Sequence, residues 1–168
     1  MDVTELVREG ENVAAVRVKN DLVPNSRWYS GSGIYRDVYL VRTNEIHFDH
    51  FGVRCATNGI YPKQDTALLQ IRAQVVNDGG TAGNVGVLHK IYDRDGKLVS
   101  TSGIALYLEP GESSDCMVRP TVESPHLWTD EDPYLYTLVS TVVSDGRELD
   151  SFACKTGIRT AVFDSDQG

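Results

Sequence analysis

The 168-residue sequence has few cysteines and few basic residues, and each shortage excludes a class of protein. Its three cysteines, Cys55, Cys116 and Cys154, lie far apart and form no C-x-x-C motif, so their spacing predicts neither a zinc site nor a disulfide framework. Lysine and arginine total 16 against 24 aspartate and glutamate residues, and no basic stripe is present to neutralise a phosphate backbone. We therefore expect no nucleic-acid partner.

Long apolar runs are also missing. No stretch approaches the roughly 20 apolar residues that a membrane-spanning helix needs. The opening M-D-V-T-E-L-V-R-E-G lacks the order of basic, apolar and small residues that marks a signal peptide. The composition, 40% apolar and 24% charged, is typical of a soluble globular protein, and we expect no membrane partner.

The apolar residues that are present recur with a period of two, which is typical of β-strands. Residues 45–164 contain about seven such short segments, separated by turn residues such as the Asp-Gly pair at 95–96. The expected elements include one strand over 45–56, a turn over 77–80, two strands on either side of 93–96 within 84–101, a separate strand over 104–108 and one over 114–122. This count and spacing predict an all-β fold, an immunoglobulin-like sandwich of two packed sheets. The clearest alternation places on one side of a strand the apolar residues Leu69, Ile71, Ala73 and Val75.

The first 44 residues do not belong to that sandwich. Residues 12–20 and 34–43 alternate like two further strands, yet a piece of about 40 residues is generally too small to hold a core of its own. We therefore expect residues 1–44 to be the remnant of a truncated domain, residues 45–164 to form the sandwich, and residues 165–168 to begin a linker.

Three motifs carry a resemblance to a known family. Residues 27–40 (R-W-Y-S-G-S-G-I-Y-R-D-V-Y-L), with the preceding G-E-N-V-A-A-V-R-V-K-N, resemble the end of the sugar-binding jelly-roll domain of glycoside hydrolase family 2. Residues 125–138 (P-H-L-W-T-D-E-D-P-Y-L-Y-T-L) resemble the signature near the end of that family's immunoglobulin-like second domain. Residues 157–164 (G-I-R-T-A-V-F-D) are similar to the segment that leads into the catalytic barrel. Among subfamilies, the first motif resembles that of β-galactosidases most.

The resemblance implies a parent enzyme whose catalytic groups are elsewhere. Enzymes of this family are retaining β-glycosidases, which use two carboxyl groups about 5–5.5 Å apart, and in the family both glutamates lie on a barrel that this chain does not include. We therefore expect a non-catalytic scaffold portion that places the jelly-roll domain against the barrel and hydrolyses nothing alone. The implied substrate is a β-linked galactoside or a related glycoside. The resemblance implies no cofactor for this fragment, a monovalent cation and Mg for the full-length enzyme, and either a cytoplasmic or a periplasmic location.

The first motif also contains the candidate site residues. On a strand, Tyr35, Asp37 and Tyr39 share one face, where a carboxylate can accept sugar hydroxyls and aromatic faces suit a pyranose. By resemblance, Asp37 matches a position that contacts the galactose hydroxyls and a monovalent cation in family β-galactosidases. We therefore expect Asp37 to contact substrate and cation in the full-length enzyme, with Trp28 and Tyr35 as weaker substrate-contacting candidates. The alternative is that Arg36 and Asp37 pair with neighbours and fix a domain junction.

Other clusters favour structural roles. Glu131 and Asp132 precede a proline and read as solvated turn charges. An aromatic set around 125–136 predicts the end cap of the sandwich, with one tyrosine hydroxyl bonded back to the chain at a corner, although it can also be read as a sugar platform. Its members are Pro125, Leu127, Trp128, Tyr134 and Tyr136.

Two further functions stay open at this level. The chain can be a stand-alone carbohydrate-binding module, which requires a concave aromatic surface and measurable sugar affinity. It can also be a protein-interaction module, because the exposed N-terminal strands offer edges for pairing with a second copy as a homodimer.

Overall fold

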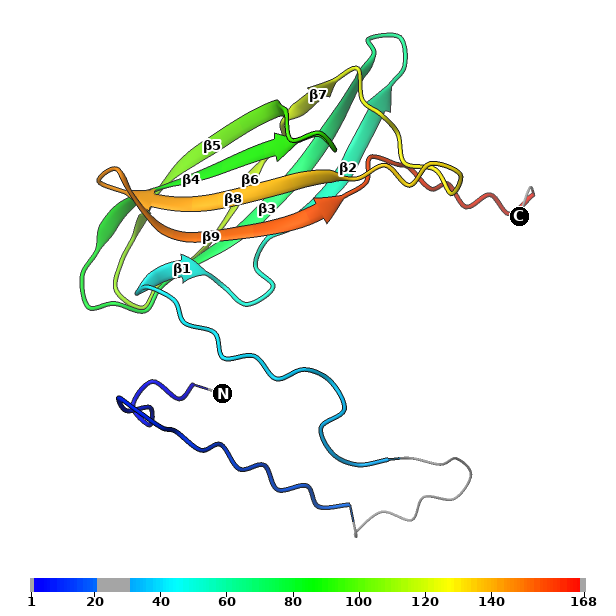
Figure 1. The fold of residues 1–168 in the computed structure, drawn as a ribbon. Coiled ribbons are helices and arrows are strands. Elements are labelled where there is room, and N and C mark those ends of the chain that lie inside the picture. The colour runs from blue at the N-terminus through cyan, green and yellow to red at the C-terminus, as the bar shows by residue number, and fades with distance from the viewer. Residues whose placement is uncertain (1, 21–30, 167–168) are drawn as a thin grey trace. The chain divides into compact units, whose positions relative to one another are not determined.

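A computed structural model describes residues 2–20 and 31–166 of the chain, which form two compact units, Met1–Val41 and Arg42–Gly168. The described part contains nine strands and no α-helix, and no helix in it is suited to crossing a membrane. All nine strands belong to the second unit (Figure 1). They are β1 (Ile46–Phe48), β2 (Arg54–Tyr61), β3 (Thr66–Asn77), β4 (Gly83–Tyr92), β5 (Leu98–Leu108), β6 (Ser113–Val118), β7 (Thr121–Glu123), β8 (Tyr136–Ser144) and β9 (Arg147–Thr156).

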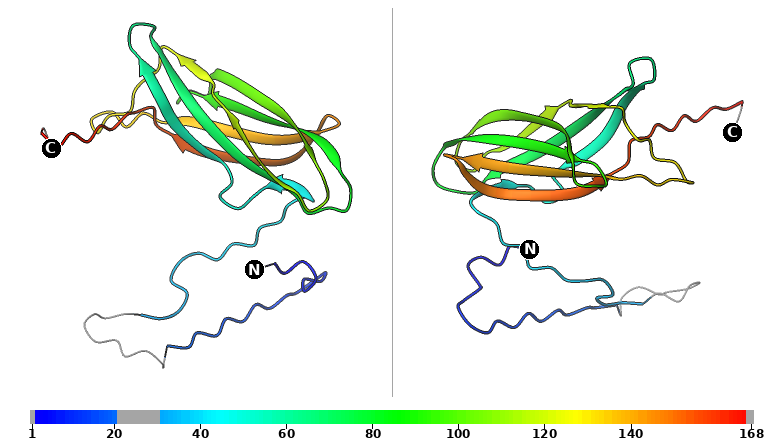
Figure 2. Two further views of the ribbon diagram at one scale, coloured as in Figure 1. Left: turned by 180° about the vertical axis from the view of Figure 1, so that it is seen from behind. Right: turned by 45° about the horizontal axis from the view of Figure 1, so that its top comes forward.

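The strands form two antiparallel sheets packed face to face, which confirms the predicted all-β sandwich (Figure 2). In the five-stranded sheet β3 is central: β1 and β2 pair with one of its edges, and β6 and β7 with the other. The second sheet has four strands in the order β5-β4-β8-β9. This arrangement buries one face of each sheet against the other, as in a β-sandwich.

Strand β3 shows how the sequence period builds the core. Its buried side chains alternate with more exposed ones along its whole length, as predicted for residues 69–75. Facing strands of the second sheet contribute their own alternating residues, and apolar burial of this kind is worth about 25 cal/mol per Å². The fully buried members of this core include Leu69, Ile71, Val75, Val87, Ile91, Leu138 and Val142.

The observed strands differ from the expected ones at two breaks. Residues 45–56 were expected as one strand, but a turn at Asp49–Gly52 separates β1 from β2: the Gly52 N–H donates to the Asp49 carbonyl (2.8 Å), and Phe51 has φ 57°. Residues 114–122 are likewise interrupted before β7, because Pro120 has no N–H to continue the ladder. Conversely, β5 runs through a segment expected as two strands.

One end of the sandwich is held together by a buried amide. Asn77, the last residue of β3, is 1% exposed. Its Nδ2 donates to the carbonyls of Thr81 (2.9 Å) and Glu109 (3.1 Å), and its Oδ1 accepts from the Gly79 N–H (3.0 Å). A single side chain therefore satisfies backbone groups of two loops that follow different strands.

The core also contains a polar row on the inner face of the four-stranded sheet. His89 on β4 lies between Ser102 on β5 and Ser140 on β8 in the strand register, and it is 1% exposed. Its Nδ1 lies 2.8 Å from the Ser140 Oγ, whereas within the described structure its Nε2 and the Ser102 Oγ are buried without hydrogen-bond partners. Burial lowers the pKa of His89 from 6.5 to about 4, because the charged imidazolium would be desolvated.

The N-terminal unit lacks the two strands expected over 12–20 and 34–43. None of the backbone hydrogen bonds among residues 2–20 and 31–43 joins these segments, and the bonds there are confined to a turn in which Leu6 and Val7 donate to the Val3 carbonyl. A strand needs a partner to satisfy its N–H and C=O groups, and the described residues of this unit supply none. The apolar side chains that stay exposed in it include Val13, Val16, Val18, Ile34, Val38, Leu40 and Val41.

Candidate functional site

The candidate residues of the N-terminal unit that the structure describes lie in a segment whose side chains are exposed. The Tyr39 hydroxyl donates to the Asp37 Oδ2 (3.1 Å), so these two predicted neighbours are brought together even without a strand. Tyr35 is 86% exposed, and the Arg36 guanidinium lies over its ring, 5.4 Å from the centroid. Trp28 lies outside the described residues. Among the described residues no hydrogen bond reaches the Asp37 Oδ1, so the segment offers one carboxylate oxygen beside two accessible phenol rings.

A second cluster lies at the end of the sandwich where β8 begins. The Tyr136 hydroxyl accepts from the His126 N–H (2.8 Å), which confirms the predicted corner. The backbone N–H of Trp128 donates to the Ile158 carbonyl (2.9 Å), and the Arg159 guanidinium lies 4.4 Å from the Trp128 ring centroid. Because its indole also lies against Gly157, where a Cβ would come within 3.0 Å of it, Trp128 packs as an end cap.

Asp132 in this cluster is paired, which differs from the expectation of a solvated turn charge. Its Oδ1 accepts from the Arg94 guanidinium (3.0 Å) and its Oδ2 lies 2.6 Å from the His126 Nε2. Arg94 and then His126 lower the pKa of Asp132. The Tyr134 ring is stacked on the His126 ring at 4.2 Å and lies 4.3 Å below Arg94. These contacts occupy the Tyr134 ring, so they disfavour the alternative of a sugar platform there.

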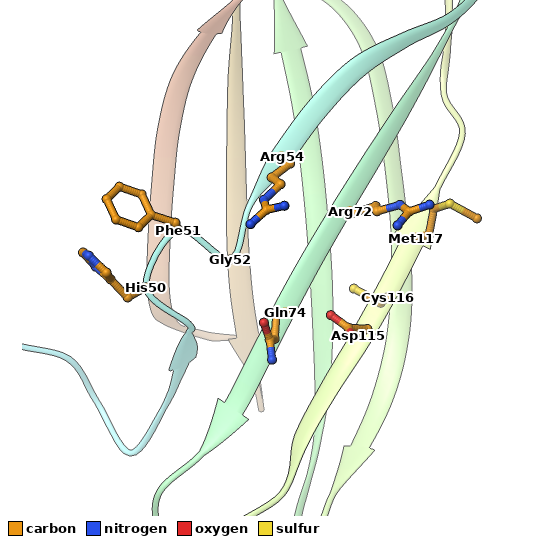
Figure 3. Close-up of a pocket in the computed structure, with 9 residues that line it drawn as sticks. All are labelled: His50, Phe51, Gly52, Arg54, Arg72, Gln74, Asp115, Cys116 and Met117. Atoms are coloured by element: carbon orange, nitrogen blue, oxygen red, sulfur yellow. The ribbon is translucent and has the colours of Figure 1, made fainter.

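A shallow hollow of about 360 Å³ lies on the outer face of the five-stranded sheet (Figure 3). Figure 3 shows Arg54 on β2 and Arg72 on β3, with Gln74 and Asp115 further along the strands and the loop before β2 at the side. The sequence analysis missed this hollow, because only the pairing register brings these strands' outward residues together. Its lining consists of His50, Phe51, Gly52, Arg54, Arg72, Gln74, Asp115, Cys116 and Met117.

A smaller hollow of about 180 Å³ lies between the β2–β3 hairpin and residues 125–127. Its lining is mostly apolar, with Tyr61 and Leu127 partly exposed, and it contains one carboxylate, Asp65. The larger hollow also contains a single carboxylate, Asp115. Within residues 2–20 and 31–166, no three His, Cys, Asp or Glu side chains gather in a way that suits a metal ion.

Comparison with known proteins identifies the family to which the chain is similar. The model of "Glycosyl hydrolases family 2" matches residues 53–159. The chain is 38% identical to the β-galactosidase BoGH2A of Bacteroides ovatus and 30% identical to a putative β-glucuronidase of Formosa agariphila, in each case over 99% of its own length. It spans only 20% and 15% of those two proteins.

Solved structures agree with this. A glycosyl hydrolase family 2 member from Bacteroides cellulosilyticus matches with a TM-score of 0.70 at 25% identity, over 75% of this chain and 17% of that one. Bacteroides uniformis β-glucuronidase 2 matches with a TM-score of 0.67 at 30% identity, over 75% of this chain and 16% of that one. The family match covers the sandwich from its first long strand to the residue stacked on the end-cap tryptophan, and the chain therefore belongs to glycosyl hydrolase family 2.

Proposed function

We propose that this chain is the non-catalytic scaffold portion of a retaining β-glycosidase, of β-galactosidase type, acting in carbohydrate metabolism. The observation that carries the proposal is a family match over the sandwich in a chain that spans only 20% of BoGH2A and 15% of the putative β-glucuronidase. A retaining glycosidase needs two carboxyl groups about 5–5.5 Å apart, and each of the two hollows described above has only one. The match to BoGH2A favours a β-linked galactoside as substrate of the whole enzyme.

In this proposal the two units have different roles. The sandwich of residues 45–164 has its own core and acts as a rigid spacer between a jelly-roll domain and a catalytic barrel. Residues 1–44 are the end of the jelly-roll domain, and residues 165–168 begin the link to the barrel. The exposed apolar side chains of the N-terminal unit support this assignment, because a segment that exposes this many large apolar side chains is typically covered by a partner.

Asp37 is the residue we propose to contact the substrate and a monovalent cation in the whole enzyme, with Tyr35 beside it. A hard cation prefers oxygen ligands, and Asp37 fits one ligand position because the Tyr39 hydroxyl bonds to its Oδ2 and no hydrogen bond from the described part of the chain reaches its Oδ1. The remaining ligands must come from outside the described residues. Magnesium, which the resemblance implies only for the full-length enzyme, has no assigned ligand in the described part of this chain.

A chimera tests the scaffold proposal. The matching segment of BoGH2A is replaced by this chain, and kcat/KM is measured with a chromogenic β-galactoside, beside the chain alone. We expect the chimera to be active and the chain alone to give no turnover. Hydrolysis by the chain alone that is abolished by a carboxylate mutation would contradict the proposal, as would a folded but inactive chimera.

The same chimera tests Asp37. Asp37→Asn removes the charge and should lower kcat/KM at least tenfold, because substrate and cation both lose a carboxylate. Asp145→Asn is the matched control, since Asp145 is also exposed and its φ of 49° is tolerated by asparagine. Equal kinetics for the two variants would remove Asp37 from the site.

A further inference from the structure

The border of the four-stranded sheet at β5 has no neighbouring strand. Among the described residues β5 pairs only with β4, and no backbone hydrogen bond from another segment reaches it (Figure 1). In an antiparallel pair every second residue directs its N–H and C=O groups away from the partner strand. This border of β5 therefore presents a row of backbone donors and acceptors on which another strand can pair.

This border also lacks the features that usually prevent such pairing. Natural sheets protect a border strand with charged side chains, prolines, bulges or a very short length. Residues 101–107 (T-S-G-I-A-L-Y), which we call the β5 edge, contain no charged residue and no proline. Their register with β4 is continuous, because the one shift in this pair lies nearer the start of β5.

The other border strands of the described structure all carry at least one protective feature. β9 has a register shift and charged residues at 147, 148, 150 and 155. β2 contains Arg54 and a register shift, and β6 contains Asp115. β1 and β7 have three residues each. Among the described strands, an unprotected border is therefore specific to β5.

The inward side chains of the β5 edge are incompletely covered. Ile104 and Leu106 pack against the core but are only partly buried. Their ladder partners on β4, Val87 and Val85, are 0% and 3% exposed. The difference arises because β5 has a neighbour on one side only. A further strand alongside would cover both side chains, so apolar burial would add to the new backbone hydrogen bonds.

A second copy of the same edge matches these properties. Two antiparallel copies aligned over their full length place Ile104 beside Ile104 of the second copy and Thr101 beside its Tyr107. This register keeps core-facing residues opposite core-facing ones, and it pairs a β-branched residue with an aromatic ring that is 55% exposed. Although each copy has a net charge of −8, no charged residue lies on the edge, so like charges do not meet there.

We propose that the β5 edge is a self-association surface, through which two copies of this chain join their four-stranded sheets into one continuous sheet. The two β5 strands run antiparallel about a two-fold axis near Ile104, an isologous contact that closes at the dimer. Residues 12–20 and 34–43, in which no strand forms, take no part in it. The surface lies within the sandwich unit and does not depend on the scaffold function proposed above.

Sedimentation equilibrium and amide hydrogen exchange of the 168-residue chain, each over a range of concentrations, test the proposal. We expect a monomer–dimer equilibrium. Protection should rise with concentration at alternate residues of 101–107, since only the N–H groups directed away from β4 gain a partner. A chain that stays monomeric throughout its soluble range would overturn the proposal, as would a dimer that protects residues 12–20 or 34–43 instead.

Lysine substitutions assign the contact. A105K should weaken dimerisation at least tenfold, because it brings two like charges close to the two-fold axis. A153K, at an exposed alanine of β9 on the opposite border of the same sheet, is the matched control and should leave dimerisation unchanged. V38K, at an exposed position of the N-terminal unit, should also leave it unchanged.

The thermal midpoint of A105K at low concentration should equal that of A153K, because both alanines are exposed and both variants are then monomeric. Undiminished dimerisation of A105K would refute the assignment of this edge. Loss of the dimer in V38K would refute it as well, because the contact would then belong to the N-terminal unit.

Discussion

Acidification should destabilise the sandwich through one buried histidine. His89 is 1% exposed and its pKa is lowered from 6.5 to about 4. Between these two pH values His89 is therefore protonated in the unfolded chain but neutral in the folded one. The stability that depends on neutral His89 is therefore complete above pH 6.5 and is lost as the pH falls towards 4. At roughly 1.4 kcal/mol per pKa unit, the loss between pH 7.5 and pH 4.5 is about 2–3 kcal/mol.

Urea unfolding of wild type and His89→Leu at pH 7.5 and 4.5 measures this loss. In the leucine variant the difference between the two pH values should shrink by about 2–3 kcal/mol, because the proton-binding group is gone. The pH difference is the useful quantity, since at pH 7.5 the variant also leaves the Ser140 hydroxyl without its partner at 2.8 Å. His50→Gln, at an exposed position, controls for the loss of one imidazole and should keep the acid destabilisation.

Two results would refute this reasoning. The first is a leucine variant that loses as much stability between pH 7.5 and 4.5 as the wild type does. The second is an NMR titration in which the His89 ring protons shift with a midpoint near 6.5, which would mean that burial does not penalise the imidazolium. A midpoint near pH 4 would support the prediction that burial lowers the pKa of His89.

Two further predictions concern Asn77, whose side chain holds two loops, and Gly52, which lies close to neighbouring backbone atoms. Asn77→Ala should lower the free energy of unfolding by about 2–4 kcal/mol, because the carbonyls of two loops lose their buried donor. Urea denaturation measures this loss of stability. A loss no larger than that caused by Asn58→Ala, at an exposed position, would contradict the prediction. Gly52→Ala should cost about 2 kcal/mol or more, since its Cβ would lie 2.8 Å from the Asp49 carbonyl oxygen. Gly80→Ala, where a Cβ meets nothing within 4 Å, should change the thermal midpoint little, and equal effects at both glycines would show that the close approach does not matter.

The fold was largely predictable because alternation depends only on neighbouring residues along one strand. The period of β3 and the tight turn at 93–96, where Gly96 has φ 83°, were both predicted from the sequence. The turn between β1 and β2 was not, because an aromatic residue at positive φ gives no local signal. Asn77 was read as a turn residue, whereas the structure buries it as the last residue of a strand.

The candidate sites were less predictable, because they depend on register and on partners. Arg54 and Arg72 are separated by a hairpin, and only the observed pairing places them opposite one another. In the N-terminal unit the sequence predicted strands that the structure does not contain. Residues 12–20 and 34–43 have strand propensity, but a strand also needs a partner strand, and the described residues do not supply one.

The central position of β3 has a consequence for biosynthesis. This strand pairs with β1 and β2 on one side and with β6 and β7 on the other, so its ladder joins residues that leave the ribosome at very different times. The edge that receives β6 stays unpaired until Ser113–Val118 have been synthesised. Such non-local pairing slows folding and leaves strand edges open to association. A nascent chain that stalls before β6 should therefore be the form most dependent on chaperones.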